Sequence, residues 1–207
     1  MTGRFVVFEG GEGCGKSTQA ALLAERIGAV LTRQPGGTEI GAALRQILLD
    51  PGSAALVPRA EALLMAADRA QHCTELIAPT LASGRHVVCD RYTYSSIAYQ
   101  GYGRGLDPAT VRSFSAWATD ELWPDVVVLL DVDVASASAR LAGDLDRFEQ
   151  AGGEFHERVR QGFLAQAVAE PDRWIVVDGS GTLDEVTAAV WAALVERLPE
   201  LVSESGR

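Results

Sequence analysis

A short stretch near the N-terminus combines the residue types that bind phosphate. Residues 10–17 read Gly-Gly-Glu-Gly-Cys-Gly-Lys-Ser, which matches the pattern Gly-x-x-x-x-Gly-Lys-Ser at every defined position. The glycines let several backbone N–H groups converge on one point, and the helix that follows adds the positive end of its dipole. Lys16 is expected to reach the β- and γ-phosphates of a nucleotide, and the Ser17 hydroxyl to hold Mg²⁺. The expected nucleoside triphosphate contacts are Gly10, Gly11, Glu12, Gly13, Cys14, Gly15, Lys16, Ser17 and Thr18.

The use of lysine sharpens this prediction. The chain has 18 lysines and arginines, and Lys16 is the single lysine among them. A compact ammonium suits a triphosphate better than a planar guanidinium does. The alternative is a glycine turn between a strand and a helix that binds nothing. The complete motif in its strand–loop–helix context favours phosphate binding.

The elements that must position this loop alternate along the chain. Strand-like apolar runs lie at residues 5–9, 29–32, 86–90, 126–131 and 174–178, with helical patterns between them. Nearly continuous apolar runs are typical of strands covered on both faces. The sequence therefore predicts an α/β fold, a parallel five-stranded sheet flanked by helices on both faces, of the P-loop NTPase type. We expect a single domain over residues 1–207, with a lid segment at 140–153. A helical region at 58–83 is expected to kink or break at Pro79.

The amino-acid composition indicates which binding partners and which cellular compartment to expect for this protein. The net charge is −10, which argues against nucleic acid and against an anionic membrane surface. No apolar run reaches membrane-spanning length, and the N-terminus lacks the pattern of a secretory signal. Three cysteines without metal-ligand spacing indicate free thiols in a reducing cytoplasm. Any anion must therefore be held by a local cluster of arginines.

A second group of polar residues follows the strand predicted at 86–90. Ligands of parallel sheets bind at the carboxyl ends of the strands. Asp90 could organise Mg²⁺ and its waters there, because this ion prefers few protein ligands. Arg91 could pair bidentately with a phosphate. The alternative for this Asp-Arg pair is a structural ion pair.

These motifs together resemble the thymidylate kinase family, whose members transfer the γ-phosphoryl group of ATP to dTMP. The resemblance extends over nearly the whole chain, in the order of the family. It includes residues 9–17, 32–38, 63–72, 103–106, 130–132 and 146–149. The strongest part is Asp-Arg-Tyr-x-x-Ser-Ser-x-Ala-Tyr-Gln-Gly at residues 90–101. The resemblance implies ATP with Mg²⁺ as the phosphoryl donor, and a homodimer.

Its implications for phosphate and sugar concern five charged residues. Glu12 would accept a hydrogen bond from the 3′-hydroxyl, and Arg45 and Arg91 would clamp the dTMP phosphate. Family members without an extra basic residue in the phosphate loop supply arginines from the lid. We expect Arg140 and Arg147 in that catalytic role, beside Lys16 and Arg91. An alternative partner for Arg147 is Glu149.

Its implications for the base concern the residues around the acceptor. Arg69 would donate to thymine O4, Ser96 would face the N3 edge, and Tyr99 would crowd the 2′ position and disfavour ribonucleotides. Gln100 belongs to the same signature and completes the expected substrate contacts. Met65 stands where the family has a phenylalanine that stacks on thymine, and a thioether gives less planar contact.

Three further positions depart from the family, and two other functions stay open. Gln34 replaces the glutamate common in the family, which removes one negative charge near the arginines. Ser138 and Ala142 stand where lid arginines are common, so the lid has few cations and we expect a modest kcat. The first alternative is a kinase for another monophosphate or nucleoside. The second is a nucleotide-binding switch without activity.

Overall fold

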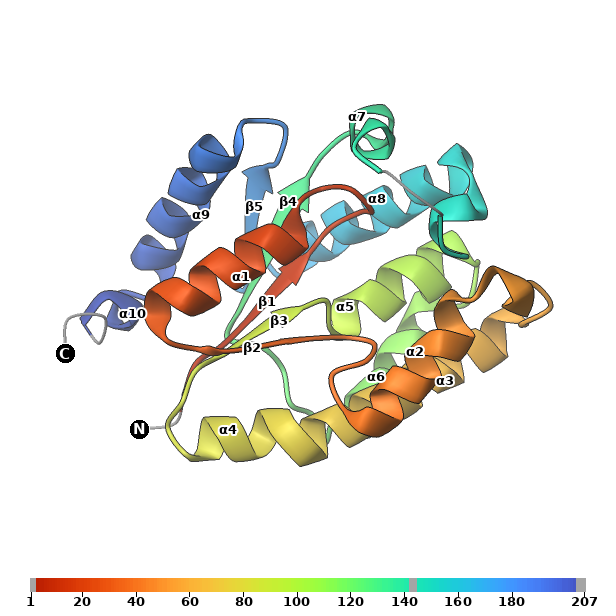
Figure 1. Cartoon of the computed structure of the whole chain (residues 1–207), viewed down its shortest axis with the longest axis horizontal. Coiled ribbons are helices and arrows are strands. Elements are labelled where there is room, and N and C mark those ends of the chain that lie inside the picture. The colour runs from red at the N-terminus through yellow and green to blue at the C-terminus, as the bar shows by residue number, and fades with distance from the viewer. Residues whose placement is uncertain (1–2, 142–144, 204–207) are drawn as a thin grey trace.

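Five parallel strands form the centre of the protein in the computed structural model, which describes residues 3–141 and 145–203 (Figure 1). Their order across the sheet is β2-β3-β1-β4-β5, with every neighbouring pair parallel. The strands are β1 (Phe5–Glu9), β2 (Val30–Arg33), β3 (Val87–Asp90), β4 (Val126–Asp131) and β5 (Trp174–Asp178). The predicted fold class is confirmed, and each strand lies within one residue of its expected position.

The central strands are apolar throughout because helices cover both of their faces. Val6 and Phe8 face the helices on one side of the sheet, whereas Phe5 and Val7 face those on the other. All four side chains are at most 1% exposed. Side chains alternate between the faces of a strand, so a strand covered on both faces must be apolar at every position.

The helices form two layers around the sheet (Figure 1). One layer packs on the side of Val6 and contains α1, α9 and α10. The other contains α3 to α6 and α8, with α2 packed against α3. The bounds are α1 (Lys16–Ile27), α2 (Glu39–Leu49), α3 (Pro58–His72), α4 (Ala78–Ala82), α5 (Thr93–Ser96), α6 (Pro108–Ala118), α7 (Val134–Ala139), α8 (Gly153–Ala169), α9 (Leu183–Arg197) and α10 (Glu200–Ser203).

The helical region expected at 58–83 is divided rather than kinked. A π-helical turn, Cys73–Ile77, connects α3 to α4. Pro79 lies in the first turn of α4, directly after this π turn, and cannot donate a backbone hydrogen bond to the turn before it. A second π turn, Ile97–Gly103, extends α5. Such wide turns are frequent at functional sites, and this one carries Tyr99 and Gln100.

The segment expected to form a lid lies between α7 and α8. A short 3₁₀ turn, Glu149–Ala151, precedes α8. Residues 142–144 lie outside the described residues, so the expectation for Ala142 falls on a position without a structural description. The three cysteines are buried and free, as predicted.

Candidate active site

The phosphate loop joins β1 to the N-terminus of α1. Gly13 and Gly15 both have positive φ angles, 73° and 90°, which favour glycine. A Cβ atom on Gly13 would lie 2.2 Å from the carbonyl oxygen of Ala137, so α7 also requires glycine there. Lys16 donates from Nζ to the carbonyl of Gly11 at 3.0 Å, and its side chain therefore folds back over the loop. The loop has the conformation that the motif predicts for holding phosphate.

A hydroxyl and a carboxylate meet beside this loop. β3 lies next to β1 with Phe8 opposite Asp90, which brings the end of β3 to the phosphate loop. Ser17 donates from Oγ to Asp90 Oδ2 at 2.5 Å, while Asp90 Oδ1 is buried with no hydrogen-bond partner among the described residues. Two hard oxygen ligands with an unused carboxylate oxygen fit Mg²⁺, which keeps most of its water when bound.

Glu12 connects the phosphate loop to the residues that follow β3. Its Oε1 accepts hydrogen bonds from Arg91 NH2 at 2.6 Å and from Tyr99 OH at 2.7 Å. Its Oε2 lies 3.7 Å from Lys16 Nζ. Burial opposes ionisation, but the guanidinium of Arg91 and the ammonium of Lys16 outweigh it, so the pKa of Glu12 lies well below its usual value. Glu12 is therefore an anion that faces both cations.

Arg91 is held in place by its backbone as well as by its side chain. Its φ is 68°, in the left-handed region that few residues other than glycine adopt. The guanidinium also donates to the Gly10 carbonyl at 2.8 Å and to Ser95 Oγ at 3.2 Å. A strained backbone held by several contacts is typical of functional positions. Arg91 is in this way fixed at the mouth of a cavity.

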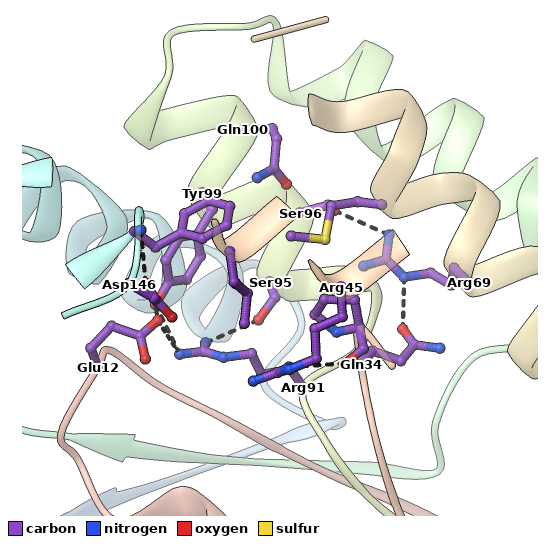
Figure 2. A pocket seen from close by; sticks show the side chains of 14 residues that line it. Glu12, Gln34, Arg45, Arg69, Arg91, Ser95, Ser96, Tyr99, Gln100 and Asp146 are labelled. Atoms are coloured by element: carbon purple, nitrogen blue, oxygen red, sulfur yellow. Dashed lines mark hydrogen bonds and ion pairs between the residues drawn. The ribbon is translucent and has the colours of Figure 1, made fainter. Parts of the chain in front are cut away.

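That cavity has a volume of about 510 Å³, part of it open to solvent, and lies between the end of β3 and the helices α2, α3 and α5 (Figure 2). Arg91 and Glu12 pair at its lower edge in this view, Arg69 and Gln34 pair at the right, and Gln100 lies at the top. Its lining residues are Glu12, Gln34, Pro35, Arg45, Leu49, Met65, Arg69, Arg91, Ser95, Ser96, Tyr99, Gln100, Asp146 and Phe148. Most of these side chains are polar or charged, and Leu49, Met65 and Phe148 add apolar surface, a combination that suits a planar base with polar edges and an attached phosphate.

Arg69 is buried at one side of the cavity and oriented by neutral groups. Its Nε donates to Gln34 Oε1 at 2.9 Å, and its NH1 donates to Ser96 Oγ at 3.1 Å. Gln34 Nε2 lies 2.9 Å from His72 Nδ1, so the amide donates to an unprotonated ring nitrogen. Burial and the charge of Arg69 lower the pKa of His72 to about 4. A neutral glutamine and a neutral histidine thus support one buried cation.

Gln100 presents an unused acceptor in the same cavity. Its Nε2 donates to Glu61 Oε1 at 2.9 Å, while its Oε1 is buried with no partner among the described residues. Gln100 as a whole is 1% exposed. Since buried polar atoms nearly always have a partner and Gln100 lines the cavity, this oxygen is available to a hydrogen-bond donor of a ligand.

A second cavity of about 1040 Å³ contains the phosphate loop and the Mg²⁺ candidates Ser17 and Asp90. Both cavities are lined by the same four side chains, Glu12, Gln34, Arg45 and Arg91. Arg45 donates from NH1 to the Pro35 carbonyl at 2.9 Å, which holds it at this shared wall. The expected phosphate-binding residues and the expected acceptor residues are thereby brought together.

The two arginines expected from the lid have other partners. Arg140 donates to the carbonyls of Gly179 and Ser180 at 2.9 and 3.1 Å. Arg147 pairs with Glu61 at 2.6 Å instead of with Glu149, because the fully buried carboxylate of Glu61 needs a cation. In this structure the Arg147 guanidinium therefore lies against α3.

Several residues of this region, among them Phe148, Asp146 and Glu61, were not among the expected site residues. Phe148 and Asp146 line the base-sized cavity, and Glu61 lies behind it. Asp146 Oδ1 accepts from the backbone N–H groups of Phe148 and Glu149, at 2.8 and 2.9 Å, and so fixes the turn that carries Phe148. The acid–x–x–acid spacing at 146–149 was a signal for this turn, although it gives no indication of which cavity the turn lines.

The fold and the two joined cavities define a P-loop nucleoside monophosphate kinase. Residues 8–190 match the family model described as thymidylate kinase. The chain is 50% identical over 195 residues to a thymidylate kinase of Cutibacterium acnes, covering 92% of this chain and 95% of the relative. It is also 50% identical over 209 residues to one from Bifidobacterium longum, covering 97% and 100%.

A solved structure agrees with these relatives. The crystal structure of thymidylate kinase from Ehrlichia chaffeensis superposes with a TM-score of 0.78 at 33% identity, covering 94% of this chain and 99% of that one. The chain belongs to the thymidylate kinase family. It is therefore an ATP-dependent nucleoside monophosphate kinase, a phosphotransferase.

Proposed function

We propose that this chain transfers the γ-phosphoryl group of ATP to dTMP, forming dTDP and ADP, at the wall shared by its two cavities. The observation that supports this proposal is the pair of cavities with Glu12, Gln34, Arg45 and Arg91 in common. A phosphate oxygen of dTMP attacks the γ-phosphorus as the bond to the leaving ADP oxygen breaks. The protein supplies position and positive charge for this exchange.

On the donor side, the loop N–H groups and Lys16 hold the triphosphate. Ser17 and Asp90 would hold Mg²⁺, which supplies charge neutralisation at the β- and γ-oxygens when bound. Lys16 donates to a loop carbonyl in the structure, and a γ-phosphate oxygen is a stronger, charged acceptor for the same ammonium. Arg140 lies on the flank of the phosphate loop, since its partner Gly179 approaches Cys14, and it is the remaining candidate for a lid cation.

On the acceptor side, Arg45 and Arg91 bind the phosphate of dTMP and Glu12 takes the 3′-hydroxyl. Arg69 donates to O4, and the unpartnered Oε1 of Gln100 accepts from N3–H. Tyr99, whose hydroxyl is bonded to Glu12, lies where it would crowd a 2′-hydroxyl. This pairing of one donor with one acceptor matches the edge of thymine.

We also propose that the kinase is a cytoplasmic homodimer without nucleic-acid or membrane partners. In the described part of the chain, no helix is long and apolar enough to cross a membrane. Ile40 and Ile47 of α2, and Leu63 of the adjacent α3, are 54, 48 and 61% exposed. Exposed apolar side chains on neighbouring helices support burial by a second copy.

The test of the reaction is an ADP-release assay with dTMP, dUMP, dCMP, dGMP and no acceptor, repeated with Lys16→Ala. We expect turnover with dTMP and a loss of kcat of at least about 100-fold in the variant. Turnover with a different monophosphate and none with dTMP would indicate the alternative function, a kinase for another nucleotide. ATP binding without turnover on any acceptor would indicate a switch.

A further inference from the structure

Glu61 occupies an unusual position behind the base-sized cavity. Its side chain is 1% exposed, on the buried face of α3, and it does not line the cavity. Three side chains from two other parts of the chain converge on its carboxylate. They are Gln100 at 2.9 Å, Arg147 at 2.6 Å and Arg104 at 3.3 Å. A buried carboxylate with two arginines is more than a structural ion pair when its remaining partner lines a ligand cavity.

The chemistry of this contact allows only one orientation of the Gln100 amide. A carboxylate accepts hydrogen bonds and cannot donate one, so the amide must turn its NH₂ group toward Glu61. The carbonyl oxygen is then directed away from Glu61 and is left without a partner among the described residues. If Glu61 were neutral or absent, the amide could rotate by half a turn and present a donor instead.

We propose that Glu61 is a positioning residue that sets base selectivity by fixing Gln100 as a hydrogen-bond acceptor. The proposal rests on the proposed function, because it assigns the acceptor to the N3–H of a 4-oxo pyrimidine. Cytosine has an unprotonated N3 and would face the same oxygen with a lone pair. A mismatch of this kind leaves buried polar atoms unpaired, which costs about tenfold or more in affinity.

The same carboxylate connects selectivity to the segment after β4. Arg147 belongs to that segment, and its Nε also donates to the Leu48 carbonyl at 2.8 Å. Phe148, its neighbour in sequence, lines the cavity. Docking of residues 145–151 and orientation of Gln100 thus depend on a single buried anion.

The experiment measures the dissociation constants of dTMP and dCMP by calorimetry, without ATP, for Glu61→Gln and Glu61→Asp. Aspartate keeps the negative charge that Arg104 and Arg147 need, but its shorter side chain moves the carboxylate away from Gln100. Glu61→Asp is therefore the test variant if Glu61→Gln does not fold. The selectivity ratio is the dissociation constant of dCMP divided by that of dTMP. We expect this ratio to fall about tenfold in Glu61→Gln, and to fall by less in Glu61→Asp. Arg104→Met is the matched control, because it removes a partner of Glu61 without touching Gln100. It should lower the melting temperature and leave the ratio within about twofold.

A double-mutant cycle separates positioning from general damage. Gln100→Leu should lower the ratio, and adding Glu61→Gln to it should cause no further change. A folded Glu61→Asp protein with the ratio of the parent would overturn the proposal, as would an equal change in Arg104→Met. If the parent protein does not prefer dTMP over dCMP at all, the proposed function fails instead.

Discussion

Met65 lines the base-sized cavity at the position where the resemblance implies a phenylalanine that stacks on thymine. It lines the cavity together with Leu49 and Phe148 and packs on the neighbouring core cluster. A thioether covers a flat base with few contacts, whereas an aromatic ring covers it over its whole face. We therefore expect affinity for the base to depend mainly on the polar edge, where Arg69 and Gln100 lie.

Replacing this residue tests that account. Met65→Phe should lower the KM for dTMP about two- to tenfold, which corresponds to an added aromatic contact of about 0.5–1.5 kcal/mol. Steady-state kinetics with varied dTMP measure the change, and the KM for ATP serves as the internal control. A KM for dTMP equal to that of the parent would contradict the account.

His72 carries a second prediction, on the dependence of stability on pH. Its pKa is lowered to about 4 by burial and by Arg69, so the folded state holds the neutral ring. As the pH falls below about 6.5, the unfolded chain takes up a proton that the folded chain refuses. The free energy of unfolding should decrease between pH 6.5 and 4, by up to about 3 kcal/mol. Urea unfolding of the parent and of His72→Gln at pH 7.5, 5.5 and 4.5 measures this. If the free energy of unfolding changed with pH in the same way in the parent and in His72→Gln, His72 would contribute nothing to the pH dependence of stability.

Among the elements, the segment of residues 145–151, part of the expected lid, is held in place by contacts with distant parts of the chain. Its Arg147 N–H donates to the Leu49 carbonyl at 3.1 Å, and its guanidinium pairs with Glu61. These contacts hold the segment against the end of α2 and the start of α3. In this structure Asp146 and Phe148 of the segment line the base-sized cavity.

The structural role of Arg147 is measurable. Arg147→Met should lower the free energy of unfolding by about 3 kcal/mol, since it removes one of two cations from a buried carboxylate. Arg140→Met is the matched control, and because Arg140 is exposed its effect should stay within about 0.5 kcal/mol. Chemical denaturation provides both values. A stable Arg147→Met protein with a collapsed kcat would favour the original expectation of a catalytic cation.

The features that could be predicted from the sequence are those set by local patterns, and the features that could not are set by contacts between distant residues. The strands and the phosphate loop were predictable, because apolar runs, glycines and Lys16 are local patterns. The partner of Arg147 was not, because Glu61 lies 86 residues away and its helix offers several carboxylates. The division of the 58–83 helix depends on backbone hydrogen bonds around Cys73–Ile77, which no single residue type specifies. Orientation of Gln100 depends on the same long-range contact.

At the scale of the whole molecule, a chain with a net charge of −10 binds two polyanions. It does so by enclosing its cations, since Lys16, Arg69 and Arg91 lie in or beside cavities rather than on an open basic surface. Exposed apolar residues lie on α2 and α3, where we propose that a second copy covers them, and also on other elements such as α6, where Trp117 is 83% exposed.

This distribution leads to a prediction on assembly. Leu63→Arg should convert the proposed dimer to a monomer, because an arginine at the centre of an apolar interface stays unpaired. Light scattering after size exclusion measures the mass. Val168→Arg is the matched control, since Val168 is 81% exposed on α8, away from the proposed interface helices. A dimeric Leu63→Arg protein would place the interface elsewhere.

The order β2-β3-β1-β4-β5 has a consequence for how such an enzyme can change. The central strand β1 ends in the phosphate loop, and its two neighbours, β3 and β4, lead to opposite sides of that loop. β3 leads into Asp90, Arg91 and the base pocket, whereas β4 leads into α7 on the opposite flank of the loop. Substitutions after β3 can therefore change the preferred acceptor while the phosphate loop stays the same. A kinase for a different nucleotide can evolve in this way without a new site for the phosphoryl donor.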